Sequence, residues 1–127
     1  MQGLRNIIVT GSNKGIGYGI VENLAAKQGW NIIMACRNVE LGDKSKAELL
    51  IKFPQASIQL EQLDVSNDKS IENFVKVVDE KYKKIDVLLN NAGVAAKGDA
   101  FDSDVVNFTF GVVSNEAMLR ISLAQSL

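Results

Sequence analysis

The sequence of 127 residues contains no histidine, and Cys36 is its only cysteine. An intramolecular disulfide is therefore impossible, and a zinc site would lack its usual cysteine and histidine ligands. Catalysis that depends on a histidine base, such as a serine–histidine–aspartate triad, is excluded for the same reason. We therefore predict no metal site and no histidine-based active site.

Long apolar segments and an excess of one charge are lacking as well. The longest uninterrupted apolar run, Ile32 to Cys36, has five residues, which is far too short to cross a membrane. Residues Met1 to Arg5 lack the charged and apolar regions of a secretion signal. The 14 basic and 15 acidic side chains are spread along the chain, so neither nucleic acid nor a membrane is indicated as a partner. We expect a cytoplasmic protein with a single domain over residues 1–127.

Short apolar runs typical of buried strands alternate with segments of helical periodicity. The pattern predicts strands at 7–9, 32–36, 57–60 and 85–89, and helices at 16–25, at 39–53, and from Asn67 or Asp68 to Tyr82. Strands separated by helices of this length are normally parallel, with helices on both faces of the sheet. We therefore predict an α/β, Rossmann-like three-layer fold with strand order 3-2-1-4. A ligand is expected at the carboxyl ends of strands one and four.

The turn between the first strand and the first helix, Thr10 to Gly17, contains three glycines. Gly11 lets the chain turn sharply, Gly15 leaves room for a pyrophosphate beside the backbone, and Gly17 permits close packing of the helix. The helix N-terminus then offers N–H groups and a positive dipole to phosphates. Because the turn lies between a predicted strand and a predicted helix, we favour dinucleotide binding over a tight turn without a ligand.

The second strand ends at Cys36 and Arg37, where an acidic residue would bind the ribose 2′-hydroxyl of NAD. No acid is present at this point of the sequence. Arg37 can meet a 2′-phosphate with its fork of donors, and Lys14 can add a second positive charge. We therefore predict NADP(H) as the cofactor, against the alternative of a solvated arginine at a strand end.

The third strand ends at Leu63 and Asp64. Asp64 could accept a hydrogen bond from the adenine amino group, or it could cap the helix that follows; the sequence favours neither.

The fourth strand ends in the sequence Asn90-Asn91-Ala92-Gly93. The asparagine amides can hold neighbouring backbone strands together or bond a ribose, and the small residues Ala92 and Gly93 let a cofactor pass close. A simple turn would also explain these residue types.

Taken together, the glycine turn, the Leu63-Asp64-Val65 strand end and the Asn90 to Gly93 segment resemble the short-chain dehydrogenase/reductase family. With Asn13-Lys14 and Arg37, they are similar to its NADPH-dependent carbonyl reductases, and the resemblance runs from about Asn6 to Phe110. It implies that Asn13, Lys14 and Arg37 grip the adenosine 2′-phosphate, and that Asp64 and Asn90 line the adenine and ribose. The implied cofactor residues are Gly11, Asn13, Lys14, Gly15, Ile16, Gly17, Arg37, Leu63, Asp64, Asn90, Ala92 and Gly93.

The family's catalytic serine and its Tyr-x-x-x-Lys pair are absent. Tyr18 and Tyr82, the two tyrosines of the sequence, have no lysine four residues later. We therefore assign no catalytic residue and predict an NADP(H)-binding, N-terminal part of a carbonyl-reductase-like protein. The alternatives are an active carbonyl reductase completed by another chain, and a non-enzymatic interaction protein.

The last segment, residues 111–127, diverges from the family pattern. Residues 115–127 have helical spacing, with Leu119, Leu123 and Leu127 four apart, so we predict a divergent C-terminal helical segment. Without later strands, the apolar fourth strand would be a sheet edge, and such edges pair with other chains. The sequence thus predicts self-association through this strand.

Overall fold

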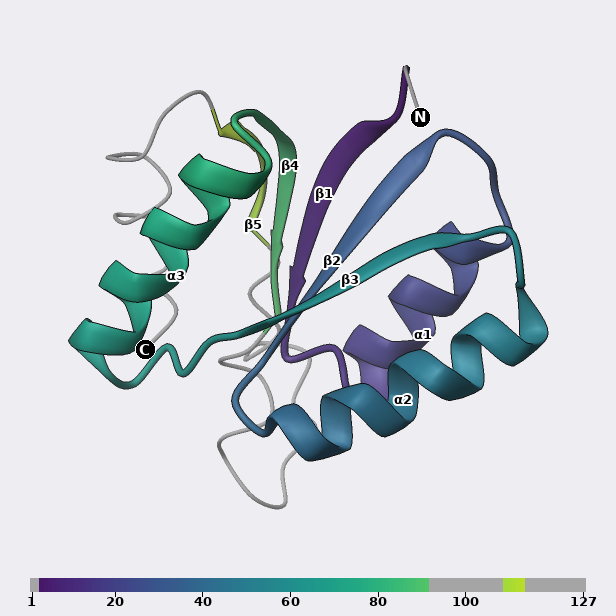
Figure 1. Ribbon diagram of the computed structural model, residues 1–127, viewed down its shortest axis with the longest axis horizontal. Helices are drawn as coiled ribbons and strands as arrows, with labels where there is room; N and C mark the ends of the chain where they lie inside the picture. The colour runs from purple at the N-terminus through teal and green to yellow at the C-terminus, as the bar shows by residue number, and fades with distance from the viewer. Residues whose placement is uncertain (1–2, 92–108, 114–127) are drawn as a thin grey trace.

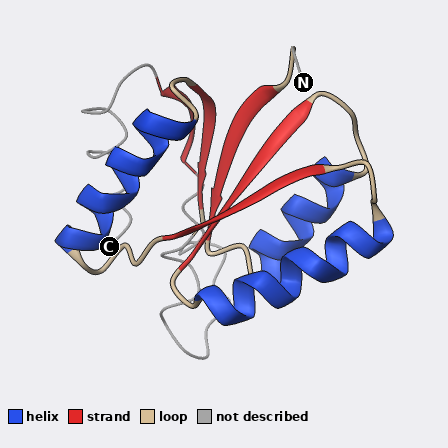
Figure 2. Ribbon diagram, in the orientation of Figure 1, coloured by secondary structure: helices blue, strands red, loops and turns tan. Residues whose placement is uncertain are grey.

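The computed structural model describes residues 3–91 and 109–113. One twisted sheet forms the middle layer, with α1 and α2 side by side on one face and α3 on the other (Figure 1). Figure 2 shows the same three layers coloured by type of element. The elements are β1 (Arg5–Thr10), α1 (Gly15–Ala25), β2 (Trp30–Cys36), α2 (Val39–Lys52), β3 (Ser57–Gln62), α3 (Asp68–Lys81), β4 (Ile85–Asn90) and β5 (Thr109–Val113).

The strands follow the order β3-β2-β1-β4-β5, and β1 to β4 are all parallel. In the centre of the sheet, Ile8 of β1 is in register with Ile33 of β2 on one side and Leu88 of β4 on the other. The predicted α/β class and the 3-2-1-4 order are therefore confirmed. Because parallel strands end on the same side, the segments after β1, β2, β3 and β4 share one edge of the sheet.

The fifth strand corrects two predictions. β5 runs antiparallel beside β4, with Ile85 opposite Val113 and Leu88 opposite Gly111. β4 is therefore an inner strand, not a sheet edge, and the predicted self-association through it loses its physical basis. Residues 111–113 are part of β5, so the helical segment predicted from residue 111 begins too early. The helix predicted over 115–127 lies outside the described residues.

Apolar side chains form a core on each face of the sheet. Alternate residues of β1 point to opposite faces, so Ile8 joins the core under α3, whereas Ile7 and Val9 join the core under α1 and α2. Phe74 of α3 and Leu49 of α2 are each at most 1% exposed at the centres of these two cores. Both faces of the inner strands are covered, which explains their nearly continuous apolar runs.

Asparagine side chains fix the starts of the second and third helices. Asn38 Oδ1 accepts a hydrogen bond from the backbone N–H of Leu41 at 3.1 Å, and Asn67 Oδ1 accepts one from Ser70 N–H at 3.0 Å. Asn67 is thus the N-cap of α3. Of the two predicted starts of this helix, Asn67 and Asp68, the cap at Asn67 is confirmed. These caps place the starts of α2 and α3 directly after the carboxyl ends of β2 and β3.

Candidate cofactor site

The turn from β1 into α1 depends on glycine for its backbone conformation. Gly11 has a φ of 60° and Gly15 a φ of 61°, both in the left-handed region that other residues rarely adopt. An added Cβ at Gly15 would meet none of the described atoms within 4 Å. The turn is therefore open at Gly15, as expected for a place where a ligand approaches the backbone.

Gly17 is required for a different reason, namely space. A Cβ added there would overlap the carbonyl oxygen of Gly11 and would lie 2.7 Å from Asn91 Nδ2. Gly17 therefore lets the first turn of α1 pack directly against the preceding turn and the end of β4. This agrees with the predicted close packing and identifies the atoms involved.

Side chains at the ends of β1 and β4 hold the turn from one side. The Thr10 hydroxyl donates to Asn90 Oδ1 at 3.1 Å and accepts from Asn91 N–H at 2.7 Å. Asn91 Nδ2 in turn donates to the carbonyl oxygens of Thr10 and Gly11, both at 3.3 Å. All three polar side chains are at most 5% exposed. The two asparagines thus hold the strands together, which was one of the two roles left open for them.

Residues of β2 and α2 hold the turn from the other side. Gly11 N–H donates to the Ala35 carbonyl at 2.8 Å, and Ser45 Oγ of α2 donates to the Asn13 carbonyl at 2.7 Å. Ser12 Oγ lies 3.5 Å from Cys36 Sγ, and both side chains are fully buried. Burial raises the pKa of the Cys36 thiol, which keeps it protonated.

Four of the residues that shape the turn were not among the predicted site residues: Thr10, Ser12, Ser45 and Asn91. The sequence contained a sign of the role of Ser45. This residue shares the buried side of α2 with Gly42 and Leu49, where an apolar residue is expected. Thr10 and Asn91 are polar residues that directly end or follow buried strands. Their hydrogen bonds depend on the pairing of β1 with β4, which local sequence does not specify.

The N-terminus of α1 carries the chemistry of an anion site. Its N-cap residue, Lys14, has an extended backbone and makes no side-chain cap hydrogen bond, and the first turn contains no acidic residue. The first N–H groups of a helix have no partner within the helix, and the helix dipole favours negative charge there. Lys14 and Gly15 are both exposed. This end of the helix therefore suits a phosphate group, and the donor set fits the predicted pyrophosphate.

A shallow, open depression of about 500 Å³ lies directly after β2 and is lined by Arg37, Asn38, Val39 and Glu40. The Arg37 side chain is exposed, as a binding group for a 2′-phosphate must be. Glu40, in the first turn of α2, adds a negative charge to the same depression. The sequence interpretation had found no carboxylate beside the two cations, so Glu40 is a correction to it. Its position one helical turn after the strand end was the missed signal.

Asp64 forms a tight turn of its own after β3. Its Oδ1 accepts hydrogen bonds from the Ser66 hydroxyl at 2.6 Å and from Ser66 N–H at 3.0 Å. These two bonds hold the pKa of the Asp64 carboxyl below its usual value. The alternative in which Asp64 caps α3 is wrong, because Asn67 is the cap. Contact with an adenine stays a prediction.

The remaining predicted site residues differ in their surroundings. The Leu63 side chain is 3% exposed and packs in the core under α3, so only its backbone could face a ligand. Ile16 is half-buried in the first turn of α1. Ala92 and Gly93 lie outside the described residues.

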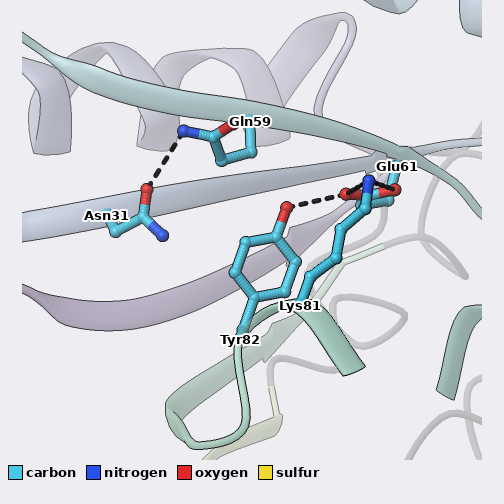
Figure 3. A network of polar contacts seen from close by, with 5 residues as sticks. All are labelled: Asn31, Gln59, Glu61, Lys81 and Tyr82. Atoms are coloured by element: carbon cyan, nitrogen blue, oxygen red, sulfur yellow. Dashed lines mark hydrogen bonds and ion pairs between the residues drawn. The ribbon is translucent and has the colours of Figure 1, made fainter. Parts of the chain in front are cut away.

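The Tyr82 hydroxyl is engaged with a side chain of β3. It donates to Glu61 Oε2 at 2.7 Å, and Lys81 Nζ lies 3.1 Å from the same oxygen (Figure 3). Burial and the bond to Glu61 raise the pKa of Tyr82. Tyr18 is half-buried against the core under α1 and α2.

The described part of the chain contains no group of acidic or cysteine side chains that could hold a metal ion. Among its helices, none is both long and apolar enough to cross a membrane.

Known proteins are similar to this chain in both sequence and fold. Retinol dehydrogenase 13 of Mus musculus is 33% identical over 108 residues, which make up 85% of this chain and 32% of the relative. Carbonyl reductase (NADPH) 1 of Mus musculus is 37% identical over 90 residues, or 71% of this chain and 32% of the relative. The solved structure of YwfH, an NADPH dependent reductase involved in bacilysin biosynthesis, has a TM-score of 0.68 and 25% identity. That likeness covers 98% of this chain and 53% of YwfH.

The chain thus spans about a third of the length of the curated relatives it matches. A family model described as short chain dehydrogenase matches residues 5–115. This match includes the glycine turn, the segment after β3 at Asp64, and the two asparagines at the end of β4, Asn90 and Asn91. The chain therefore belongs to the short-chain dehydrogenase/reductase family.

Proposed function

We propose that the chain binds NADP(H), with the pyrophosphate at the N-terminus of α1 and the adenosine 2′-phosphate at Arg37. The observation that carries this proposal is the combination of an open turn at Gly15 with an α1 N-terminus that has no side-chain cap. Unpaired N–H groups, the helix dipole and the Lys14 charge all favour a phosphate at this position.

Preference for the 2′-phosphate is supported by Arg37 in the depression after β2. A guanidinium can donate two parallel hydrogen bonds to a phosphate. The likeness to carbonyl reductase (NADPH) 1 supports the same cofactor. Glu40 opposes it by charge, and we expect Arg37 and Lys14 together to outweigh this single carboxylate.

We further propose that the chain is the cofactor-binding part of a carbonyl-reductase-like oxidoreductase and is inactive by itself. A bound NADPH supplies the hydride in such chemistry, while a protein group must donate a proton to the carbonyl. Tyr82 is a poor donor, because its hydroxyl already bonds to Glu61 and its pKa is raised. The 127 residues contain neither a histidine nor a Tyr-x-x-x-Lys pair. A buried, unpaired Cys36 suits the reducing cytoplasm.

Calorimetric titration with NADP+, NAD+ and 2′,5′-ADP tests the cofactor proposal. We expect NADP+ and 2′,5′-ADP to bind within about tenfold of each other, and NAD+ to bind at least about tenfold more weakly than NADP+. Equal binding of NADP+ and NAD+ would contradict recognition of the 2′-phosphate. A far larger advantage of NADP+ over 2′,5′-ADP would show contacts with the nicotinamide half and contradict the inactive form.

Two arginine variants serve as a matched pair. Arg37→Met removes the charge from the proposed site, whereas Arg5→Met removes one at the start of β1, at the opposite end of the parallel strands. Arg5 stacks over the Trp30 ring at 4.1 Å and has no place in the proposed site. Only Arg37→Met is expected to remove the preference for NADP+ over NAD+.

A further inference from the structure

Ser45 makes an unusual hydrogen bond from the middle of α2. Its side chain is 8% exposed and lies on the buried side of the helix with Gly42 and Leu49. A serine inside a helix commonly donates to the carbonyl four residues earlier. Here the hydroxyl donates instead to the carbonyl oxygen of Asn13, at 2.7 Å and 32 residues earlier in the chain.

This bond fixes more than one atom of the glycine turn. The Asn13 carbonyl and the Lys14 N–H belong to one planar trans peptide group, so they point in opposite directions. A hydrogen bond to the carbonyl therefore also sets the direction of the Lys14 N–H, directly before the start of α1. Gly11 and Gly15, both with positive φ, give this turn little stiffness of its own. An external contact is needed to hold it in one conformation.

The same bond joins the two halves of the proposed cofactor site. Arg37 lies between the last residue of β2, Cys36, and the N-cap of α2, Asn38. Its position therefore depends on where α2 begins. Asn13 and Lys14 belong to the turn that leads into α1. The Ser45 side chain thus links the segment that carries Arg37 to the segment that carries Lys14, in addition to the Gly11–Ala35 hydrogen bond and the Ser12–Cys36 contact at the end of β2.

We propose that Ser45 is a positioning residue that holds the glycine turn and Arg37 at a fixed separation. This inference rests on the proposed binding of NADP(H). A ligand that reaches both halves of the site gains from their fixed separation, because less conformational freedom is lost on binding. A ligand that touches neither the glycine turn nor Arg37 gains nothing from it.

Two serine variants of the full chain test whether the Ser45 hydrogen bond favours only a ligand that reaches both halves of the site. Ser45→Ala removes the hydroxyl and keeps a strong helix former in α2. Ser57→Ala is the matched control, because the Ser57 hydroxyl also donates at 2.7 Å, to Asn31 Oδ1, at the amino end of β3. That end of the sheet lies opposite the proposed site.

The ligands are NADP+, which reaches both halves, and adenosine, which carries neither the 2′-phosphate nor the pyrophosphate. Ser45→Ala is expected to weaken NADP+ binding about threefold to tenfold and to leave adenosine binding within about twofold of wild type. Ser57→Ala should change neither dissociation constant. Unchanged NADP+ binding in Ser45→Ala, or equal weakening of both ligands, would overturn the proposal.

Hydrogen exchange of the ligand-free protein separates this inference from the proposed function. Backbone amides of residues 11–17 should exchange faster in Ser45→Ala and at the wild-type rate in Ser57→Ala. Ser45→Cys keeps a similar volume with only a weak donor and should exchange like Ser45→Ala. Wild-type exchange rates in both Ser45 variants would contradict the inference, whatever nucleotide binds. An absence of NADP+ binding by the wild-type chain would instead refute the proposed function.

Discussion

Asn91 Nδ2 lies 3.3 Å from the carbonyl oxygen of Gly11, a residue 80 positions earlier in the chain. The same nitrogen donates to the Thr10 carbonyl. It also lies 2.7 Å from the position that a Cβ atom would take at Gly17. The amide therefore fills the junction of β1, β4 and α1. Its donor character matters here, because carbonyl oxygens lie opposite the nitrogen.

Replacing this donor by an acceptor should be worse than removing it. Asn91→Ala loses two hydrogen bonds, and we expect it to lower the free energy of unfolding by about 1 to 3 kcal/mol. Asn91→Asp places a carboxylate against two carbonyl oxygens in a buried position, so its loss at neutral pH should be larger by at least about 1 kcal/mol. Urea denaturation measures both values.

Asn23→Asp is the control for the asparagine variants. Asn23 Nδ2 donates to the Gly19 carbonyl at 3.0 Å on the exposed side of α1. Solvent can replace this bond, so the expected loss is below about 0.5 kcal/mol. Similar losses for Asn91→Asp and Asn91→Ala would contradict the expected repulsion between a carboxylate and the two carbonyl oxygens.

Gly17 and Gly19 of α1 should respond to alanine in opposite directions. Gly17→Ala forces a methyl group onto the Gly11 carbonyl and the Asn91 amide, which we expect to cost about 1 to 3 kcal/mol of stability. The turn must also shift, so NADP+ binding should weaken by at least about tenfold. Gly19→Ala meets no atom of the described residues within 4 Å and should stabilise the helix by about 0.5 to 1 kcal/mol. Thermal unfolding and calorimetric titration compare the two variants, and equal effects would contradict the crowding argument.

Removing the charge of Glu40 should strengthen the binding of a 2′-phosphate. Glu40 lines the same depression as Arg37, and like charges there repel the ligand. We expect Glu40→Gln to tighten NADP+ binding about twofold to fivefold at low salt, with less effect at high salt. NAD+ binding should not improve. Glu48→Gln, an exposed change later in the same helix, is the control. A gain shared by NAD+ would mean that Glu40 acts on something other than the 2′-phosphate.

The Tyr82–Glu61 contact predicts a loss of stability in alkaline solution. Burial first, and then the bond to Glu61, raise the Tyr82 pKa above its ordinary value of 10.0. The folded protein thus favours the neutral phenol, and this stabilisation is complete below the unfolded pKa. This stabilisation is lost as the pH rises from about 10 toward the Tyr82 pKa of the folded protein. Over this range the tyrosine ionises in the unfolded chain before it ionises in the folded protein.

Tyr82→Phe should lower the free energy of unfolding at neutral pH by about 1 to 2 kcal/mol, because a hydrogen bond to a charged acceptor is lost. It should also reduce the further decline as the pH rises above about 10. Tyr18→Phe keeps the contact between Tyr82 and Glu61 and should retain the wild-type decline. An unchanged alkaline decline in Tyr82→Phe would contradict the assignment.

Local patterns in the sequence were sufficient for most of the fold. Apolar runs such as Ile32 to Cys36 predicted the buried strands, because burial on both faces demands apolar residues at every position. The turn at Gly11 and Gly15 was predictable, since positive φ nearly requires glycine. The 3-2-1-4 order followed from the helical crossovers, whose handedness is almost fixed.

Features that depend on long-range pairing were not predictable. β5 pairs antiparallel with β4, and nothing in the residues 109–113 specifies that partner or that direction. The Ser45 and Asn91 contacts cross 32 and 80 residues, so they exist only once the strands are in register. Glu40 could not be placed from the strand end alone, because it lies in the first turn of α2, which lines the same depression as Arg37.

The central position of β1 sets the order in which this site can form during synthesis. Among the described strands, β1 is made before the others, and it pairs with β2 on one side soon afterwards. Its other side stays open until β4 is made, when Ile8 comes into register with Leu88. Thr10, Gly11 and Gly17 can therefore reach their final arrangement only at that stage, since Asn91 follows β4 directly. The glycine turn precedes Asn91 by about 80 residues, so it matures only after β4 and the residue that follows it have been made.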